Sequence, residues 1–136
     1  MAVTARKRSA PQSFLANCQA SDAVGDLVYV SDDMVGGLYT VMKVDYEDRA
    51  KMPAMGMIVA KIDDTACMVQ VQGEVRDLYT GLTPGRYCFI GNGARLTQVV
   101  PSTPDVGVRY SQPAAYALAS NTLLLRMELP TVRTAN

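Results

Sequence analysis

The sequence predicts an all-β domain, a small antiparallel β-sandwich or barrel with an extended N-terminal arm. Roughly seven or eight short runs rich in β-branched and aromatic residues recur at about 8 to 12-residue spacing, and turn residues separate them. No stretch has the 3.6-residue period of a three-turn amphipathic helix. The chain has 136 residues, 49% of them hydrophobic, which is enough for one domain with one core. A jelly roll, an immunoglobulin-like sandwich and a small barrel all share this spacing, so the strand order stays open.

Residues 1–22 are expected to form an extended basic arm, because they have no sustained period and Pro11 disfavours a helix. The first 20 residues carry three basic and no acidic side chains, whereas the rest of the chain carries 10 basic and 13 acidic ones. Phe14 and Leu15 form an apolar pair that would anchor the arm on a partner's surface. A frayed terminus is the alternative. The basic residues of the arm are Arg6, Lys7 and Arg8.

The β domain is expected over residues 23–130, and its first half is predicted to hold four strands. Both alternating faces of residues 24–30 are apolar, which is typical of a strand buried on both sides. Residues 45–53 are charged and end in proline, which predicts an exposed loop or at most one helical turn. The four strands are residues 24–30, 38–44, 55–61 and 66–76, the last of them half-exposed, and the turns between them contain Asp32, Asp33, Gly36 and Gly37, then Asp63, Asp64 and Thr65.

The second half begins with a turn in which Pro84 and Gly85 favour type II geometry, since proline holds φ near −65° and glycine accepts a positive φ. Glycines 91 and 93 around Asn92 predict a tight hairpin. Two prolines and a glycine make residues 101–112 a loop. The expected strands are residues 86–90, 95–100, 114–119 and 122–129, and residues 131–136 are expected to be a loose C-terminal tail.

Composition excludes several kinds of chemistry. Histidine is absent, which removes Ser-His-Asp and Cys-His catalysis and His-ligated zinc or haem. The acidic pairs lie in predicted turns, where aspartate bonds nearby backbone amides, and they lack the spacing of a calcium loop. We therefore predict no enzyme activity, no catalytic or cofactor-binding residues, no metal site and no cofactor. The cysteines lie in apolar runs without CxxC spacing, and we interpret them as core residues in a reducing compartment: Cys18, Cys67 and Cys88.

Three segments follow one another as VGDLVYVSDDMVGGLYTV, MGMIVAKIDDTACMVQVQGEV and GLTPGRYCFIGNGARLTQVVP, and a final stretch contains YALASNTLLLRM. Their order resembles a β module of tailed-bacteriophage structural proteins, including head decoration (cement) proteins, capsid fibres and some tail-fibre parts. The resemblance covers residues 24–127. Gly81, Leu82, Pro84 and Gly85 match the turn of that module, Tyr87 the strand after it, and Leu96, Thr97 and Pro101 the returning segment.

The resemblance implies a virion structural protein that binds the outer capsid surface at capsomer junctions and stabilises the head. The expected partners are the major capsid protein and, in a homotrimer, further copies of the chain, with production in the host cytoplasm and residence on the capsid. We expect no nucleic acid or membrane partner, because the arm has only three basic residues and no apolar run could span a bilayer. The expected capsid-binding residues are Arg6, Lys7, Arg8, Phe14 and Leu15.

Two other functions are also compatible with the sequence. The first is a host-adhesion module of a tail fibre or capsid spike, in which residues 45–53 or 101–112 would bind a surface glycan. The second is a small glycan hydrolase, for which the sequence offers only scattered carboxylates.

Overall fold

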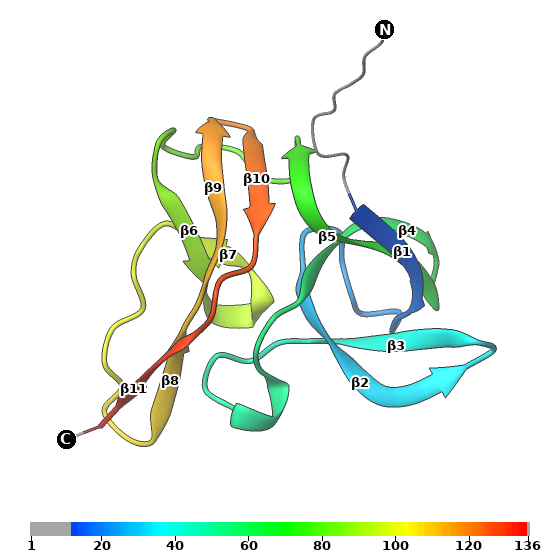
Figure 1. The fold of residues 1–136 in the computed structure, drawn as a ribbon, viewed down its shortest axis with the longest axis horizontal. Helices are drawn as coiled ribbons and strands as arrows, with labels where there is room; N and C mark the ends of the chain where they lie inside the picture. The colour runs from blue at the N-terminus through cyan, green and yellow to red at the C-terminus, as the bar shows by residue number, and fades with distance from the viewer. Residues whose placement is uncertain (1–11, 136) are drawn as a thin grey trace, which may run out of the picture.

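A computed structural model describes residues 12–135, and its all-β architecture confirms the fold class that the sequence predicts. Within that range eleven strands and two short 3-10 turns follow one another (Figure 1). The elements are β1 (Gln12–Asn17), β2 (Leu27–Val35), β3 (Leu38–Lys43), η1 (Arg49–Lys51), β4 (Gly56–Asp63), β5 (Ala66–Arg76), β6 (Tyr87–Ile90), η2 (Asn92–Ala94), β7 (Leu96–Thr97), β8 (Val108–Ser111), β9 (Pro113–Ala119), β10 (Thr122–Arg126) and β11 (Thr131–Thr134).

Strands β1 to β5 close into a barrel. Hydrogen-bonded neighbours run in the order β1-β3-β2-β4-β5, and β1 also pairs with β5, which completes the ring. The β1–β3 pair is parallel, and the other pairs of the ring are antiparallel. This barrel is the blue-to-green half of Figure 1.

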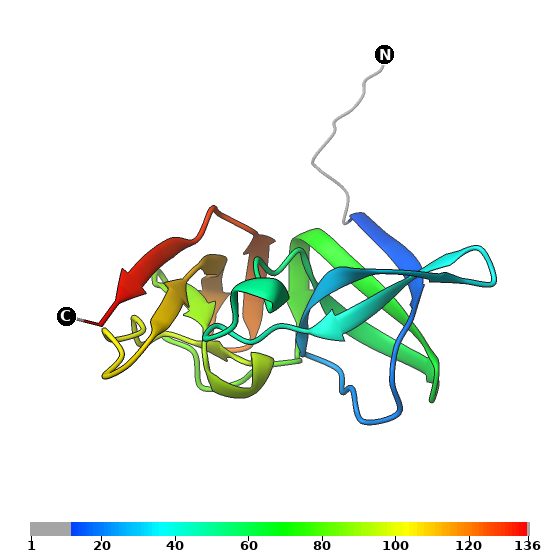
Figure 2. The same ribbon diagram turned by 90° about the horizontal axis from the view of Figure 1, so that it is seen from below.

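Strand β5 extends beyond the barrel and connects it to further strands of the same sheet. Its first residues pair with β1 and β4, and its last residues pair with β10. The sheet then continues through β9 and β6 to β7, and the part made of the end of β5 with β10, β9, β6 and β7 is called the second sheet below. Strands β8 and β11 form a separate two-stranded ladder. The two halves lie side by side along the long axis of the molecule (Figures 1 and 2).

Two hydrophobic cores, rather than the single core that composition suggests, lie on either side of β2 and β4. Leu27 belongs to the core beneath the second sheet and Val28 to the core of the barrel, and both are fully buried. Met57 and Ile58 repeat this arrangement on β4. Adjacent strand residues point to opposite faces, so the expected burial on both sides holds for Leu27 and Val28, while the strand begins at Leu27 rather than Val24, and Tyr29 and Val30 are half-buried.

Both ends of the domain differ from the expected boundaries. Residues 12–22, expected to belong to the arm, contain β1, and Ala16 within it is fully buried. The expected tail contains β11, which pairs with β8 along its whole length. Both segments are short, and only their pairing with distant strands identifies them as part of the fold. Residues 1–11 lie outside the described residues.

The local turn predictions differ in accuracy. Gly36 and Gly37 form the β2–β3 turn with positive φ angles of 62° and 79°, and Gly85 has the positive φ expected after Pro84. Asp32 and Asp33 instead lie within β2, because the hairpin extends beyond the barrel. The hairpin at residues 91–93 pairs β6 with β7 as predicted, through a 3-10 turn, and the returning strand is limited to Leu96–Thr97.

Two long-range polar contacts join the halves of the molecule. The side chain of Gln112, fully buried, accepts from the Ala54 amide at 2.9 Å and donates to the Ala54 carbonyl at 3.0 Å. Arg95 donates to the Val24 carbonyl at 3.0 Å and to the buried carboxylate of Asp26 at 3.2 Å. Both contacts connect the barrel with the elements around the second sheet.

Candidate functional site

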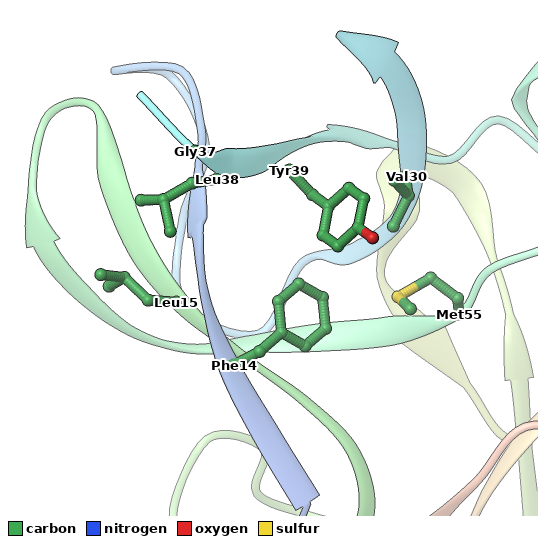
Figure 3. Close-up of a pocket in the computed structure, with 7 residues that line it drawn as sticks. All are labelled: Phe14, Leu15, Val30, Gly37, Leu38, Tyr39 and Met55. Carbon is green, nitrogen blue, oxygen red and sulfur yellow. The ribbon is translucent and has the colours of Figure 1, made fainter. Parts of the chain in front are cut away.

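An apolar groove opens on the barrel between β1 and β3. It has a volume of about 530 Å³, and nearly all of its lining is hydrophobic. Phe14 and Tyr39 face one another across it, and Val30 and Met55 close one side (Figure 3). The lining residues are Phe14 and Leu15 of β1, Val30 of β2, Gly37, Leu38 and Tyr39 at the start of β3, and Met55 before β4.

The groove exists because β1 and β3 diverge. Along its length β1 pairs with β5, from Gln12 to Asn17. Among the described residues its ladder with β3 has a single register position, Asn17 opposite Thr40. The side-chain Nδ2 of Asn17 adds two hydrogen bonds at that point, to the backbone carbonyls of Val35 at 2.9 Å and Leu38 at 3.1 Å. Strands β1 and β3 are therefore joined only at the Asn17 end of β1, and the barrel wall is open between them along the rest of β1.

Several apolar side chains at and beside the groove are exposed to solvent. Leu15 is 41% exposed and Tyr39 is 52% exposed. The β2–β3 hairpin projects from the barrel (Figure 2). Met34 and Val35, near its turn, are exposed to a greater degree than Leu15 and Tyr39. Clustered exposed apolar surface of this kind marks an interaction site more often than isolated exposed residues do.

A second, more polar cleft continues from the groove and shares Val30 and Met55 with it. Ser31 and Asp32 are among its lining residues, and its volume is about 550 Å³. Together the groove and the cleft therefore offer an apolar part and a more polar part that includes an acidic side chain.

The second acidic pair, Asp63 and Asp64, lies in a turn, as the sequence predicts. Asp63 Oδ1 accepts from the amide of Thr65 at 2.8 Å and from its hydroxyl at 3.2 Å, and these bonds hold the pKa of Asp63 below its usual value. Over the part of the chain that the structure describes, no three His, Cys, Asp or Glu side chains come together as a metal site.

The cysteines are buried, free thiols. Burial raises the pKa of Cys67 to about 12, and its neighbour Cys18 adds to the shift. Burial likewise raises the pKa of Cys88 to about 11. At neutral pH Cys67 and Cys88 are therefore uncharged thiols that pack as small hydrophobic side chains, and they lack the reactive thiolate form.

Two of the five expected capsid-binding residues lie in the groove. Phe14 and Leu15 line it, and Arg6, Lys7 and Arg8 lie outside the described residues. Sequence reasoning missed the partners of the first two, Val30, Leu38, Tyr39 and Met55. These residues are ordinary strand hydrophobics in the sequence, and only the closing of the ring brings them together.

The loops predicted for adhesion also meet one another. Arg109 joins them, since it donates to Glu47 Oε2 at 2.6 Å and to the Ser102 carbonyl at 3.1 Å. Its guanidinium lies 5.1 Å from the centre of the Tyr46 ring. The cleft beside this contact has a volume of about 290 Å³, and Asn92 is among its other lining residues.

Comparison of the chain with protein-family models, with curated proteins and with solved structures gives no match. Among the described residues, no helix has the length and apolar character needed to cross a membrane.

Proposed function

We propose that this chain is a tailed-phage head decoration (cement) protein, which binds as a homotrimer to the outer surface of the capsid at capsomer junctions. The observation that supports this most is the groove between β1 and β3. Phe14 and Leu15, two of the expected capsid-binding residues, lie in its wall. The basic segment with Arg6, Lys7 and Arg8 precedes β1 directly in the chain.

In the proposed mechanism the protein holds neighbouring capsomers together by non-covalent contact and catalyses no reaction. A protein that spans two capsomers adds buried surface that must be exposed again before the capsomers separate. Leu15 and Tyr39 are about half-exposed, and covering each stabilises the contact by about 1 kcal/mol at ~25 cal/mol per Å² of apolar surface. Many copies around the shell repeat this small contribution, although the cost of association offsets part of it at each site.

The basic segment has a different role in this proposal. Its three positive charges would attract an acidic patch of the major capsid protein, and attraction between exposed charges speeds association and weakens as salt rises. The groove would then provide the contact that slows dissociation. Capsid affinity is therefore expected to have a salt-dependent part from the segment and a salt-independent part from the groove.

The test is co-sedimentation of the purified chain with heads of the phage that encodes it, prepared without the chain. Leu15→Ser and Tyr39→Ser should each weaken binding about fivefold to tenfold, since 1.4 kcal/mol is a factor of ten. Val132→Ser is the matched control, because Val132 is 48% exposed and lies on β11. Binding by both groove variants that equals that of the control would remove the groove from the proposal.

The basic segment needs its own variant. Deletion through residue 20 would remove β1 and open the barrel, so the variant replaces Arg6, Lys7 and Arg8 with serine and leaves the fold intact. We expect weaker binding at low salt and a flatter salt dependence. Binding to heads that does not differ from wild type at any salt concentration would show that the segment makes no contact.

A second candidate function, host adhesion, draws on the meeting of the two loops at the Arg109 cleft. There Asn92 and Ser102 offer polar groups suited to sugar hydroxyls. Because the Arg109 guanidinium already lies over the Tyr46 ring, the cleft has less aromatic surface for stacking on a sugar. A glycan array probed with wild type and Asn92→Ala decides this: hits lost in the variant favour adhesion, and an array without hits rejects it.

A further inference from the structure

Asn92 and Gly93 are an exposed Asn-Gly pair in the turn between β6 and β7. They belong to η2, and Gly91, which precedes this 3-10 turn, makes no side-chain cap. A backbone hydrogen bond from the Gly91 amide to the Arg95 carbonyl, 2.7 Å long, closes the turn. Gly93 has a positive φ of 72°, and no atom of another described part of the chain lies within 4 Å of the place where a Cβ would stand. The peptide unit between Asn92 and Gly93 is therefore open to solvent.

The other asparagines in the described part of the chain are held in place by hydrogen bonds. Asn17 Nδ2 donates to two backbone carbonyls, at 2.9 and 3.1 Å. Asn121 Nδ2 donates to Asp77 Oδ1 at 2.8 Å. Each of these two asparagines is followed by a residue that has a side chain. Asn92 differs in both respects, because its exposed side chain has no hydrogen bond to another described residue and because glycine follows it.

An exposed asparagine followed by glycine can lose its side-chain amide without an enzyme, and asparagine is for this reason a thermolabile residue. The backbone nitrogen of Gly93 would attack Cγ of Asn92 and form a bond to it. The proton of that nitrogen passes to Nδ2, and Nδ2 leaves as ammonia. The product is a succinimide ring, which water opens at one of its two carbonyls to give aspartate or isoaspartate. Glycine favours the attack, because it has no Cβ beside the nitrogen and its backbone rotates freely.

We propose that Asn92 is a site of spontaneous deamidation, in which water is the co-reactant and an aspartyl or isoaspartyl residue is the product. The new side chain is a carboxylate at neutral pH. Asn92 lines the cleft beside Arg109, and it also lines a cleft of about 360 Å³ to which Lys43 and Lys51 contribute. The reaction therefore puts a negative charge into both clefts. In the first of them, the described lining residues include no acidic side chain before the reaction.

The isoaspartyl product has a second consequence, because its side-chain carbon becomes part of the backbone and lengthens the turn. Ala94, which follows Gly93, is 1% exposed in the core beneath the second sheet and has a positive φ of 63°. A longer backbone at this point displaces Ala94, so the isoaspartyl form should unfold at a lower urea concentration than the aspartyl form. Deamidation at Asn92 depends on neither candidate function, because it needs only the turn and water.

The experiment is incubation of the purified chain at neutral pH, with brief digestion by trypsin at intervals. Trypsin cleaves after Arg86 and Arg95, so residues 87–95 form one peptide in which Asn92 has the only side-chain amide. Mass spectrometry distinguishes the amide from the acid, and chromatography separates the two acidic products. Conversion of Asn92 should be within about tenfold of the rate in a synthetic peptide of residues 87–95, because exposed turns open locally at almost no cost in free energy.

The other asparagines and two variants are the controls. Peptides that contain Asn17 and Asn121 should keep their amides over the same time. Asn92→Gln should keep its charge, because glutamine closes its larger ring much more slowly, and Asn92→Asp marks the elution position of the product. On anion exchange the wild-type chain, which has a formal net charge of zero, should move to the position of Asn92→Asp. Conversion of Asn92 below the tenfold limit would overturn the inference, as would equal conversion of Asn121.

Discussion

Replacement of Ile58 by alanine tests whether β4 contributes buried side chains to the core of the barrel as well as to the core beneath the second sheet. Ile58 is fully buried in the core of the barrel, on the strand that forms one wall of that core. Ile62 lies on the same strand, is 59% exposed, and has the same side chain. The two substitutions therefore remove the same atoms from one strand and differ only in burial.

The expected cost at Ile58 has two parts. Removal of a buried isoleucine side chain to alanine loses its transfer free energy and leaves a cavity, which together cost about 2 to 5 kcal/mol. A middle value of about 3 kcal/mol lowers the urea midpoint by about 1.5 M if the m value is about 2 kcal/mol per M. At Ile62 the same change should stay within about 0.5 kcal/mol, because that side chain is mostly in solvent.

The assay is equilibrium urea unfolding followed by tyrosine fluorescence and by far-ultraviolet circular dichroism. The two probes should report one transition if both cores unfold together. A midpoint for Ile58→Ala that lies within error of Ile62→Ala would refute the assignment of Ile58 to a packed barrel interior. A separation of the two probes in wild type would show that the barrel and the second sheet unfold independently.

Four further outcomes follow from named contacts and from the burial of the cysteines. Arg95→Ala removes a partner of the buried Asp26 carboxylate and should cost about 1 to 2 kcal/mol in urea unfolding, whereas Arg126→Ala breaks an exposed ion pair and should cost at most about 0.5 kcal/mol. Gln112→Leu leaves two buried backbone groups without partners and should cost about 2 to 4 kcal/mol, and a loss below 1 kcal/mol would contradict the buried clamp. Burial raises the pKa of Cys67 from 9.0 to about 12, so the unfolded chain gives up this proton more easily than the folded one, and the contribution of Cys67 to the free energy of unfolding should be constant below pH 9 and fall between pH 9 and 12. The thiols should correspondingly resist Ellman's reagent at pH 8 until urea is added, and rapid labelling of the native chain would contradict their burial.

Much of the fold could be predicted where neighbouring residues decide it. The strand over residues 66–76 matches β5 at both ends, because polar and apolar residues alternate there and turns bound it. The glycine turn at residues 36 and 37 and the positive φ of Gly85 follow from the backbone freedom of glycine. The double burial of Leu27 and Val28 follows from a run that is apolar on both alternating faces.

The ends of the domain and most of the candidate site could not be predicted in this way. Phe14 and Leu15 stand out in the sequence as an apolar pair, but nothing local shows that they pair with Val69 and Met68 of β5. In the sequence, the surroundings of Tyr39 do not differ from those of the other tyrosines in predicted strands. Its exposure at a groove depends on the divergence of β1 from β3.

The sequence by itself determined the fold class, the positions of the glycine turns and the apolar character of Phe14 and Leu15, because each depends on side-chain chemistry and backbone freedom within a few residues. Only the tertiary structure decided that β1 closes a barrel, that a groove remains beside it, and that Tyr87 of β6 contacts Tyr116 of β9. These features depend on which distant strands pair and in which register. Strand pairing is chosen by the packing of the whole chain, since the backbone hydrogen bonds that it satisfies are the same for many alternative partners.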